Sequence, residues 1–564
     1  DEVEAATRAH LRPGMSLALL CVLFAFAGGF VAGDQAWLPQ RYLVPVKDWI
    51  KTRLEMAAPP PRVTRETVST GLLRLDLERI RVPGLREGAG GGLTSVRDHL
   101  LLVTHDGNVL RVDGTSTHPT SIRPPDNGFR AYRSASGTPR YENLNHNLLW
   151  FRYNDVLYFE SDGSGALALS YTEWHDAAEC YTTTVARLDL GPAPVDVVAT
   201  NAGPEDWRIL FRTEPCLPLK KTMRALEGQM AGGRMAYDPS TGLILLGSGD
   251  YHWDGLYAPD VLAQDPRNDY GKVLEIDPQT GASSHRSIGH RNVQGLALDT
   301  SGRLWGVEHG PRGGDELNLI RPGRNFGWPR VTLGTAYSGL PWPDASPYGR
   351  HDGYAEPVFA WVPSIATSNL VQVRGFDPAW DGDLMVASLR SGSLFRVRLA
   401  GDRVQVVEPI PLGEPIRYVH QHSDGRLVAW TDQHQIVFIS KSHERAAAAR
   451  AALLIKEQGL DPARAGALTS ALGGCLECHG LAPSSTDAVP HLGQVFGGPV
   501  AGSSYPGHSP ALEARGGRWT RAALTAFLSD PQAFAPGTTM PAPNLSSRTV
   551  NDLVSLLERL SHPE

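Results

Sequence analysis

The sequence predicts a mainly β protein, a six-bladed β-propeller with an N-terminal transmembrane helix and a C-terminal all-α domain. Three observations predict this organisation. An uncharged apolar run covers residues 15–33, short β-prone segments fill residues 70–440, and helix-favouring segments with Pro/Gly loops follow. A chain of 564 residues is also too long for one compact core, so several domains are expected.

The composition is that of an ordinary globular protein. Hydrophobic residues make up 41% and charged residues 20%, with a formal net charge of -7. Nothing in these values indicates a nucleic-acid partner, which would need a clustered basic face. The 59 glycines and 43 prolines are scattered, which is typical of many short strands joined by turns.

The apolar run Met15 to Gly33 is predicted to be a membrane anchor. At 1.5 Å per residue, about 19 helical residues just span the bilayer core. The alternative is a cleaved secretory signal, for which Val31-Ala32-Gly33 would be a tolerable cleavage site. Arg8 and Arg12 precede the run, which favours a cytoplasmic tail over residues 1–14.

Residues 34–69 are expected to form a juxtamembrane linker between the anchor and the propeller. Within it, residues 46–54 either lie along the membrane surface or form a plain linker helix.

An internal repeat in residues 70–440 predicts the blades. YDPSTGLILLGSGD, LDTSGRLWGVEHG and QHSDGRLVAWTDQ each join a polar turn and a glycine to a hydrophobic strand. Their aspartates Asp238, Asp299 and Asp424 lie 61 and 125 residues apart, one and two units of a period near 60. About six such units fit this region, which favours a propeller over a pair of β-sandwiches.

The five cysteines fall into three groups. Cys475 and Cys478 belong to one motif, and Cys21 lies in the apolar run. Cys180 and Cys216 remain, and in a secreted domain such a pair is more often a disulfide than two free thiols.

From residue 441 the chain becomes helical. Residues 441–462 are Ala-rich with helical spacing and are predicted to form a connector helix. Residues 463–564 follow as a separate domain.

The motif Cys475-Leu476-Glu477-Cys478-His479 predicts covalent attachment of one haem c. Both thiols can form thioethers to the haem, and the histidine can bind its iron. A zinc site would need four ligands, and no second CxxC or paired histidines accompany this motif. Met540, in a Pro-bounded loop, is the candidate sixth ligand, although buried methionines are usually packing residues. Ligation by His and Met closes the iron to substrates and suits electron transfer.

The C-terminal domain resembles class I cytochrome c. The resemblance rests on Pro490-His491-Leu492-Gly493, Phe496-Gly497, Tyr505, Trp519 and the loop ending at Met540. It implies that Cys475 and Cys478 hold the haem and that His479 and Met540 are the axial ligands of its iron.

The middle region resembles the soluble aldose (glucose/sorbosone) dehydrogenases, six-bladed propellers that use pyrroloquinoline quinone (PQQ) and calcium. The resemblance rests on residues 289–295, 308–320 and 325–329. It implies possible PQQ contacts at Asn145, Arg291, Asn292, Tyr337, Arg390 and Arg417. It also implies possible calcium ligands at Gly310 and Pro311 beside the cofactor, and at Glu316 and Phe326 in a structural site.

Several positions depart from that family's pattern. The general-base histidine is replaced by Met230, whose thioether cannot take a proton. Pro415 replaces the first arginine of a pair, and Arg390 stands where lysine is usual. The sequence therefore indicates no confident catalytic residue and weakens the expectation that PQQ binds. His146 and His309 are the candidates to replace the missing base.

Two functions fit these observations. In the first, the propeller oxidises a sugar or other alcohol and passes electrons to its own haem. In the second, which the anchor and the lost base favour, it is a scaffold that docks the cytochrome onto a redox partner or a respiratory or photosynthetic membrane complex. Either way, a c-type haem indicates the oxidising side of a membrane. We expect a single-pass protein of the bacterial inner membrane with both domains in the periplasm.

Overall fold

The computed structural model does not cover the predicted anchor. The predicted tail (1–14), the predicted anchor (15–33) and Asn145 all lie outside the residues that the structure describes. No helix of the described residues is long and apolar enough to cross a membrane. The described residues are 63–85, 89–114, 116–135, 151–219, 229–343, 345–346, 350–442, 444–476, 478–482, 490–502 and 508–562.

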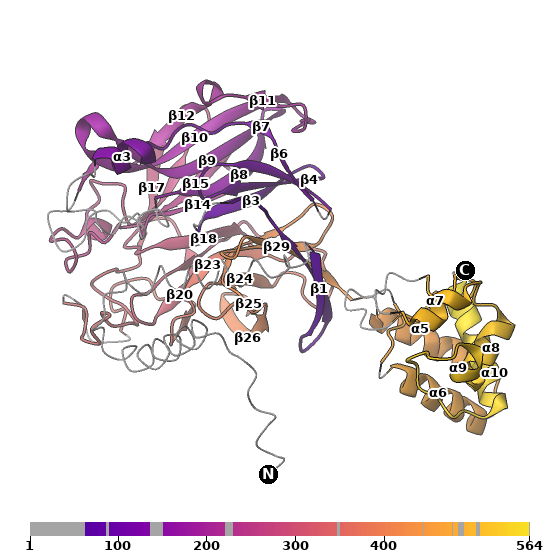
Figure 1. Ribbon diagram of the computed structural model, residues 1–564. Helices are drawn as coiled ribbons and strands as arrows, with labels where there is room; N and C mark the ends of the chain where they lie inside the picture. Colours follow the sequence, from indigo (N-terminus) through magenta and orange to yellow (C-terminus); the bar gives the residue numbers. More distant parts are fainter. Residues whose placement is uncertain are drawn as a thin grey trace, which may run out of the picture. The chain divides into compact units, whose positions relative to one another are not determined.

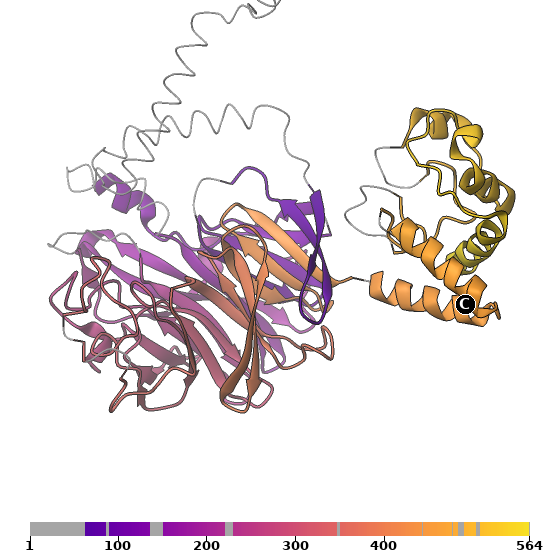
Figure 2. The ribbon, with the colours of Figure 1, turned by 90° about the horizontal axis from the view of Figure 1, so that it is seen from below.

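Six antiparallel sheets form the blades of a propeller (Figures 1 and 2), as the sequence predicted. The first blade has β3 (Gly91–Val96), β4 (His99–Thr104), β5 (Val109–Asp113) and β6 (Ser116–Pro119). The second has β8 (Tyr153–Ser161), β9 (Ser164–His175), β10 (Cys180–Pro192), β12 (Arg208–Arg212) and β13 (Leu217–Pro218). The third has β14 (Gly232–Asp238), β15 (Leu243–Ser248), β16 (Lys272–Ile276), β17 (Ser283–Ile288) and the parallel β21 (Arg324–Asn325).

The fourth blade has β18 (Val293–Leu298), β19 (Leu304–Glu308), β20 (Asp315–Ile320) and β22 (Phe359–Trp361). The fifth has β23 (Thr367–Gln372), β24 (Leu384–Ser388), β25 (Ser393–Ala400) and β26 (Arg403–Pro411). The sixth has β27 (Ile416–Gln421), β28 (Leu427–Thr431), β29 (Gln435–Lys441), β2 (Arg74–Arg81) and β1 (Val63–Ser69). Smaller elements are β7 (Ser121–Ile122), β11 (Asn201–Ala202), α3 (Phe129–Ala135), η2 (Asp176–Ala178), η3 (Pro204–Asp206) and η4 (Leu262–Gln264).

Strands from both ends of the propeller segment close the ring in the sixth blade. β2 pairs with β29 from Leu75 opposite Lys441 to Arg81 opposite Gln435. β1 then pairs with β2 along its whole length. Residues 63–69 were expected to belong to the linker. They form a strand instead, because their Val and Thr residues favour β structure once an edge strand is available.

The innermost strands β3, β8, β14, β18, β23 and β27 contact one another in a closed ring. Each leads into a hairpin to the second strand of its blade. Of the repeated aspartates, Asp238 is the last residue of β14, and Asp299 and Asp424 lie in the turns that follow β18 and β27. The periodic motif thus marks the end of an innermost strand, and the starts of these strands gather at the opposite end of the axis.

Arg234, in β14, connects the starts of the innermost strands. It is 2% exposed, and its guanidinium donates to the carbonyls of Gly91 (2.9 Å), Asn154 (2.6 Å), Gln294 (3.2 Å) and Arg417 (3.1 Å). These four carbonyls belong to β3, β8, β18 and β27. One side chain therefore joins five of the six innermost strands.

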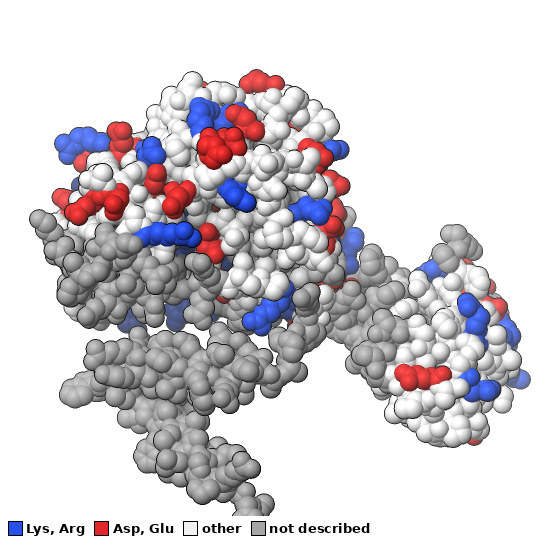
Figure 3. All heavy atoms as spheres, turned by 45° about the horizontal axis from the view of Figure 1, so that its top comes forward, with Lys and Arg blue, Asp and Glu red and all other residues white. Residues whose placement is uncertain are grey.

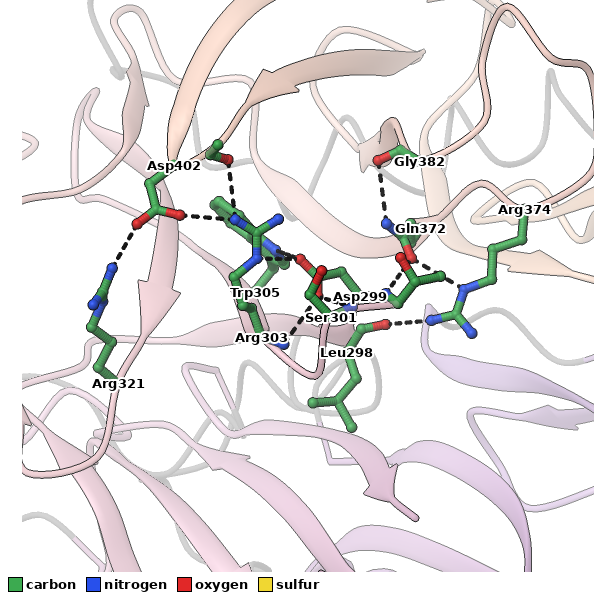
Figure 4. Close-up of polar contacts among 12 residues, drawn as sticks. Leu298, Asp299, Ser301, Arg303, Trp305, Arg321, Gln372, Arg374, Gly382 and Asp402 are labelled. Carbon is green, nitrogen blue, oxygen red and sulfur yellow. Dashed lines mark hydrogen bonds and ion pairs between the residues drawn. The ribbon is translucent and has the colours of Figure 1, made fainter. Parts of the chain in front are cut away.

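At the other end of the strands, hydrogen bonds join the fourth and fifth blades (Figure 4). Arg374 donates to the carbonyl of Leu298 (2.8 Å), and the amide of Thr300 donates to Gln372 (2.9 Å). Side chains of both signs are mixed over the propeller face drawn in Figure 3.

The second blade contains a disulfide between Cys180 and Cys216. Their Cα atoms lie 5.6 Å apart, and the bridge joins the first residue of β10 to the residue just before its paired strand β13. Cys475 and Cys478 are free thiols.

The C-terminal domain is a cluster of helices. They are α5 (Glu444–Glu457), α6 (Pro462–Leu476), α7 (Pro510–Arg515), α8 (Arg521–Ser529), α9 (Pro531–Phe534) and α10 (Ser547–Ser561). The hydroxyl of Ser546 caps α10 by accepting from the amide of Thr549 (3.1 Å). Apolar residues then recur three and four positions apart, and α10 buries Val550, Leu553, Val554, Leu557 and Leu560.

The predicted connector helix is part of this domain. Its buried residues Ala451, Leu454 and Ile455 lie in the same hydrophobic cluster as Leu468 of α6 and Leu553 of α10. The helical spacing was correct, but residues 441–462 do not form a separate connector. The apolar stripe of α5 needs a partner, and α10 provides it.

We expect Arg234→Met to destabilise the propeller by at least about 3 kcal/mol, because four buried carbonyls lose their donor. Thermal unfolding followed by circular dichroism measures this effect. Arg321→Met is the matched control. Arg321 makes an exposed ion pair with Asp402 and should change stability by less than about 0.5 kcal/mol. Equal effects of the two variants would contradict the role given to Arg234.

Candidate functional site

The candidate residues of the propeller gather where the innermost strands begin. Met230 precedes β14, Arg291 and Asn292 precede β18, and Arg417 is the second residue of β27. The chain enters β14 through a tight turn in which Gly232 has φ +65°, and a Cβ there would lie 2.4 Å from the carbonyl of Gly247. Glycine is therefore required at this approach.

Arg291 is buried and only partly satisfied. One terminal nitrogen donates to the carbonyls of Gly310 (2.9 Å) and His309 (3.2 Å), and the guanidinium lies 5.1 Å from the Trp328 ring. Its Nε and its other terminal nitrogen have no hydrogen-bond partner among the described residues. Buried donors without acceptors are costly, so this site suits an anionic ligand such as a carboxylate.

The other predicted PQQ contacts have different surroundings. Asn292 accepts from the amide of Gly232 (3.1 Å) and from Gln294 (2.9 Å), so it joins the third and fourth blades. Arg417 makes two hydrogen bonds to Asp432, of 2.8 and 2.6 Å. Arg390 and Tyr337 are exposed, Tyr337 by 57%. Among the described residues that were predicted to contact PQQ, only Arg291 therefore has buried donors without a hydrogen-bond partner.

A small cavity beside Arg291 contains three of the predicted calcium ligands. Gly310, Glu316 and Phe326 line it, and its volume is about 10 Å³, the scale of one water-sized particle. Burial, and then the nearby Glu308 carboxylate, raise the pKa of Glu316 to about 8. Pro311, the fourth predicted ligand, is buried next to Gly310.

A cation would relieve the crowding of carboxylates around Glu316. Asn318 already donates to Glu316 (3.1 Å) and Glu308 (2.8 Å), and its own Oδ1 has no partner among the described residues. No group of three or more His, Cys, Asp or Glu in the described ranges could hold a metal. Calcium would therefore depend on the Glu316 carboxylate, with Glu308 beside it, and on carbonyls, which its preference for oxygen ligands allows.

Sequence reasoning missed a cluster next to Met230. Asp250, His252 and Asp254 follow β15, and all three are buried. His252 Nε2 lies 3.2 Å from Oε1 of Gln229, the residue before Met230. The signal was the run Asp250-Tyr251-His252-Trp253-Asp254, which is unusually rich in polar and aromatic side chains after a buried strand.

Of the two histidines proposed to replace the base, His146 lies outside the described residues. His309 is engaged, because its Nε2 lies 2.5 Å from the carbonyl of Thr367. Burial lowers the pKa of His309, which further weakens it as a proton acceptor.

The C-terminal domain contains a cleft that fits a haem. His479 Nδ1 lies 2.6 Å from the carbonyl of Pro490, which fixes a proton on Nδ1 and leaves Nε2 to bind a metal. The cleft has a volume of about 470 Å³. Its lining includes Cys475, Cys478, His479 and Met540 together with the apolar Leu492, Leu524, Phe527 and Leu553.

This arrangement matches the residues that the sequence assigned to the haem. The amides of Cys478 and His479 both donate to the carbonyl of Cys475, so a tight turn places the thiols and the imidazole on one cleft. Two free thiols, a metal-binding nitrogen and a thioether are the complete set for a covalent haem with His/Met ligation.

We expect Met540→Ala to lower the reduction potential of the haem and to open its iron to added cyanide or carbon monoxide. Optical redox titration and ligand-binding spectra measure both effects. An unchanged potential and an iron that remains closed would show that Met540 packs in the cleft without binding the iron.

We expect calcium to stabilise the propeller and so to raise its unfolding temperature. At a calcium concentration about 100 times the dissociation constant, the free energy of unfolding should increase by about 2.7 kcal/mol. Glu316→Gln should abolish this increase, because it removes one of the two carboxylates that line the cavity, and the other, Glu308, is already held by His290, Arg291 and Asn318. Differential scanning calorimetry with calcium or with EDTA makes the comparison. A variant that calcium still stabilises would place the cation elsewhere.

Comparisons with known proteins agree with this division of the chain. The family model described as glucose/sorbosone dehydrogenase matches residues 158–439. The aldose sugar dehydrogenase of Escherichia coli is 33% identical over 239 residues, covering 40% of this chain and 62% of that protein. A crystal structure of a glucose dehydrogenase aligns with a TM-score of 0.50 and 26% identity, over 67% of this chain and 99% of that one.

The C-terminal region matches a cytochrome c homologue of Rickettsia bellii. The two are 38% identical over 90 residues, which cover 16% of this chain and 52% of that protein. The chain spans 58% and 62% of the length of the first curated relatives of its propeller. The family model nevertheless covers half of the chain. The protein therefore belongs to the glucose/sorbosone dehydrogenase family, and its propeller is joined to a C-terminal region that matches cytochrome c homologues.

Proposed function

We propose that this protein oxidises a small sugar or other alcohol at the propeller and passes the electrons to its own covalent haem. The two buried donors of Arg291 that have no hydrogen-bond partner among the described residues carry this proposal. Unsatisfied buried donors lower the stability of the fold. In a scaffold that no longer bound a ligand, no binding energy would offset that cost. Their position beside the cavity of Glu316 suits an anionic cofactor and a nearby cation.

Quinone cofactors such as PQQ supply a carbonyl that accepts a hydride when they are bound. In this chain, Arg291 would pair with a carboxylate of the cofactor. The Glu316 carboxylate and the Phe326 carbonyl would hold a structural calcium, while the Gly310 carbonyl accepts from Arg291 (2.9 Å). Trp328, which stacks on Arg291, keeps water from that side of the guanidinium.

Electron transfer to a tethered haem needs no diffusing partner for its first step, because the tether keeps donor and acceptor at a high effective concentration. His/Met ligation then suits the haem to pass the electron on to a redox protein or a membrane complex. We also propose that residues 15–33 anchor the protein in the inner membrane, with both domains in the periplasm. Their uncharged composition supports this placement.

A second candidate is an electron-transfer subunit whose propeller serves only for docking. Met230 favours it, because the family's proton acceptor is lost. The Arg417–Asp432 pair also favours it, since a guanidinium held by two hydrogen bonds has less to offer a cofactor. In this case the propeller would bind a membrane complex and present the haem to it.

The deciding experiment supplies the purified, oxidised protein with PQQ and calcium, adds a panel of aldoses and follows the haem absorbance. We expect reduction that depends on both sugar and PQQ. A haem that dithionite reduces but no sugar does would support the docking subunit instead.

We expect Arg291→Met to weaken PQQ binding about 100-fold, because two charge-assisted hydrogen bonds are lost. Fluorescence titration with PQQ measures the affinity, and Arg321→Met again serves as the control. Equal affinities of Arg291→Met and the parent protein would remove the main support for the proposal.

A further inference from the structure

We propose that His252 takes the proton from the substrate hydroxyl, in place of the histidine that the related dehydrogenases have at the position of Met230. This inference rests on the proposed dehydrogenase function. It assigns the base to a residue that sequence comparison with the family would not select.

Strand pairing places His252 beside Met230. β14 and β15 form a hairpin in which Gly232 lies opposite Ser248. The pairing continues beyond the strands, because the amides of Gly249 and Tyr251 donate to the carbonyls of Ala231 and Met230, each at 3.0 Å. The two segments therefore run side by side, and His252 Nε2 reaches the side chain of Gln229 at 3.2 Å.

The surroundings of the imidazole orient it as a proton acceptor. Oδ2 of Asp254 lies 3.7 Å from His252 Nδ1, and the Tyr257 ring packs against the imidazole at 4.9 Å. The backbone amides of Leu256 and Tyr257 hold the Asp254 carboxylate through its other oxygen, at 3.0 and 2.9 Å. The Asp254 carboxylate on the Nδ1 side favours a proton on Nδ1. With the Gln229 amide turned so that its nitrogen faces the ring, the amide donates in this contact and Nε2 is the acceptor.

The backbone here is held in a conformation that L-residues avoid. Met230, Tyr251 and His252 have φ values of 58°, 49° and 62°. Each left-handed non-glycine residue costs on the order of 1 kcal/mol, and such strain tends to occur at functional sites. The amide of His252 donates to Asp250 (2.8 Å), and this bond helps to maintain the turn. Glycine would remove the strain, but it would also remove the imidazole.

In the proposed step, the O–H bond of the substrate breaks and its proton moves to His252 Nε2. A carbonyl forms as the hydride on the same carbon leaves for the oxidised quinone, which gains two electrons. The resulting imidazolium faces the Asp254 carboxylate, which stabilises the positive charge. No further reactant is required.

The test compares His252→Gln with Met230→His and with the double variant, each loaded with PQQ and calcium. We expect His252→Gln to slow sugar-dependent haem reduction by about 10² to 10⁴-fold. Its affinity for PQQ and its unfolding temperature should stay unchanged. Met230→His in the His252→Gln background should restore reduction. His285→Gln is the matched control, since His285 also faces a carboxylate, at 2.8 Å from Asp269, on the outer strand β17.

Chemical labelling gives a readout that does not depend on turnover. Diethyl pyrocarbonate should modify His252 in the cofactor-free protein, and PQQ with calcium and an unreactive sugar analogue should protect it. His285 should react equally in both states. Peptide mass spectrometry locates the modified residues.

Three results would overturn the assignment, each in a different way. If the parent protein reduces its haem with sugar and His252→Gln does so equally fast, the base lies elsewhere. If His252→Gln loses PQQ binding together with turnover, His252 holds the cofactor and does not take the proton. If the parent protein shows no sugar-dependent reduction at all, the proposed function itself fails.

Discussion

The propeller depends on one buried cation at its axis. The Arg234 guanidinium donates to carbonyls of four neighbouring innermost strands, lies 3.8 Å from Asp155 and stacks on Tyr418 at 4.7 Å. A charge buried this deeply is tolerated only when its donors are matched and a counter-charge is close. Its surroundings must therefore keep the starts of five strands at fixed distances. The candidate site lies on those same strand starts, so its geometry follows from the closure of the ring.

This arrangement explains why Arg291 can keep unsatisfied donors. The ring holds the segment before β18 in place, and the backbone amide of Arg291 donates to Glu308 (2.8 Å). The side chain thus cannot rotate outward to reach water without breaking contacts with Gly310 and Trp328. Stability gained along the strands can offset unsatisfied groups at their starts, which is how rigid scaffolds hold binding sites ready for a ligand.

How much the sequence could predict differed between local and long-range features. The haem residues Cys475, Cys478 and His479 form one short motif, and the blades repeat around aspartates such as Asp299, so both could be read along the chain. The packing of α5 on α10 could not, because an apolar stripe does not identify its partner. His252 was missed for a related reason. The β14–β15 pairing shifts register between Gly232 and Arg234, so counting along the strands does not align His252 with Met230.

The same hairpin makes it structurally simple to exchange one base for another. Residues 229–231 and 249–252 are held together by backbone hydrogen bonds that do not depend on the side chains at positions 230 and 252. A histidine lost from one segment and gained on the other leaves the ring, the pairing and the cation cavity unchanged. The exchange changes only which carboxylate the imidazole faces. For His252 this carboxylate is Asp254, which two backbone amides hold in place. Family membership therefore does not by itself identify the proton acceptor in this propeller, because its scaffold allows that group on either side of one turn.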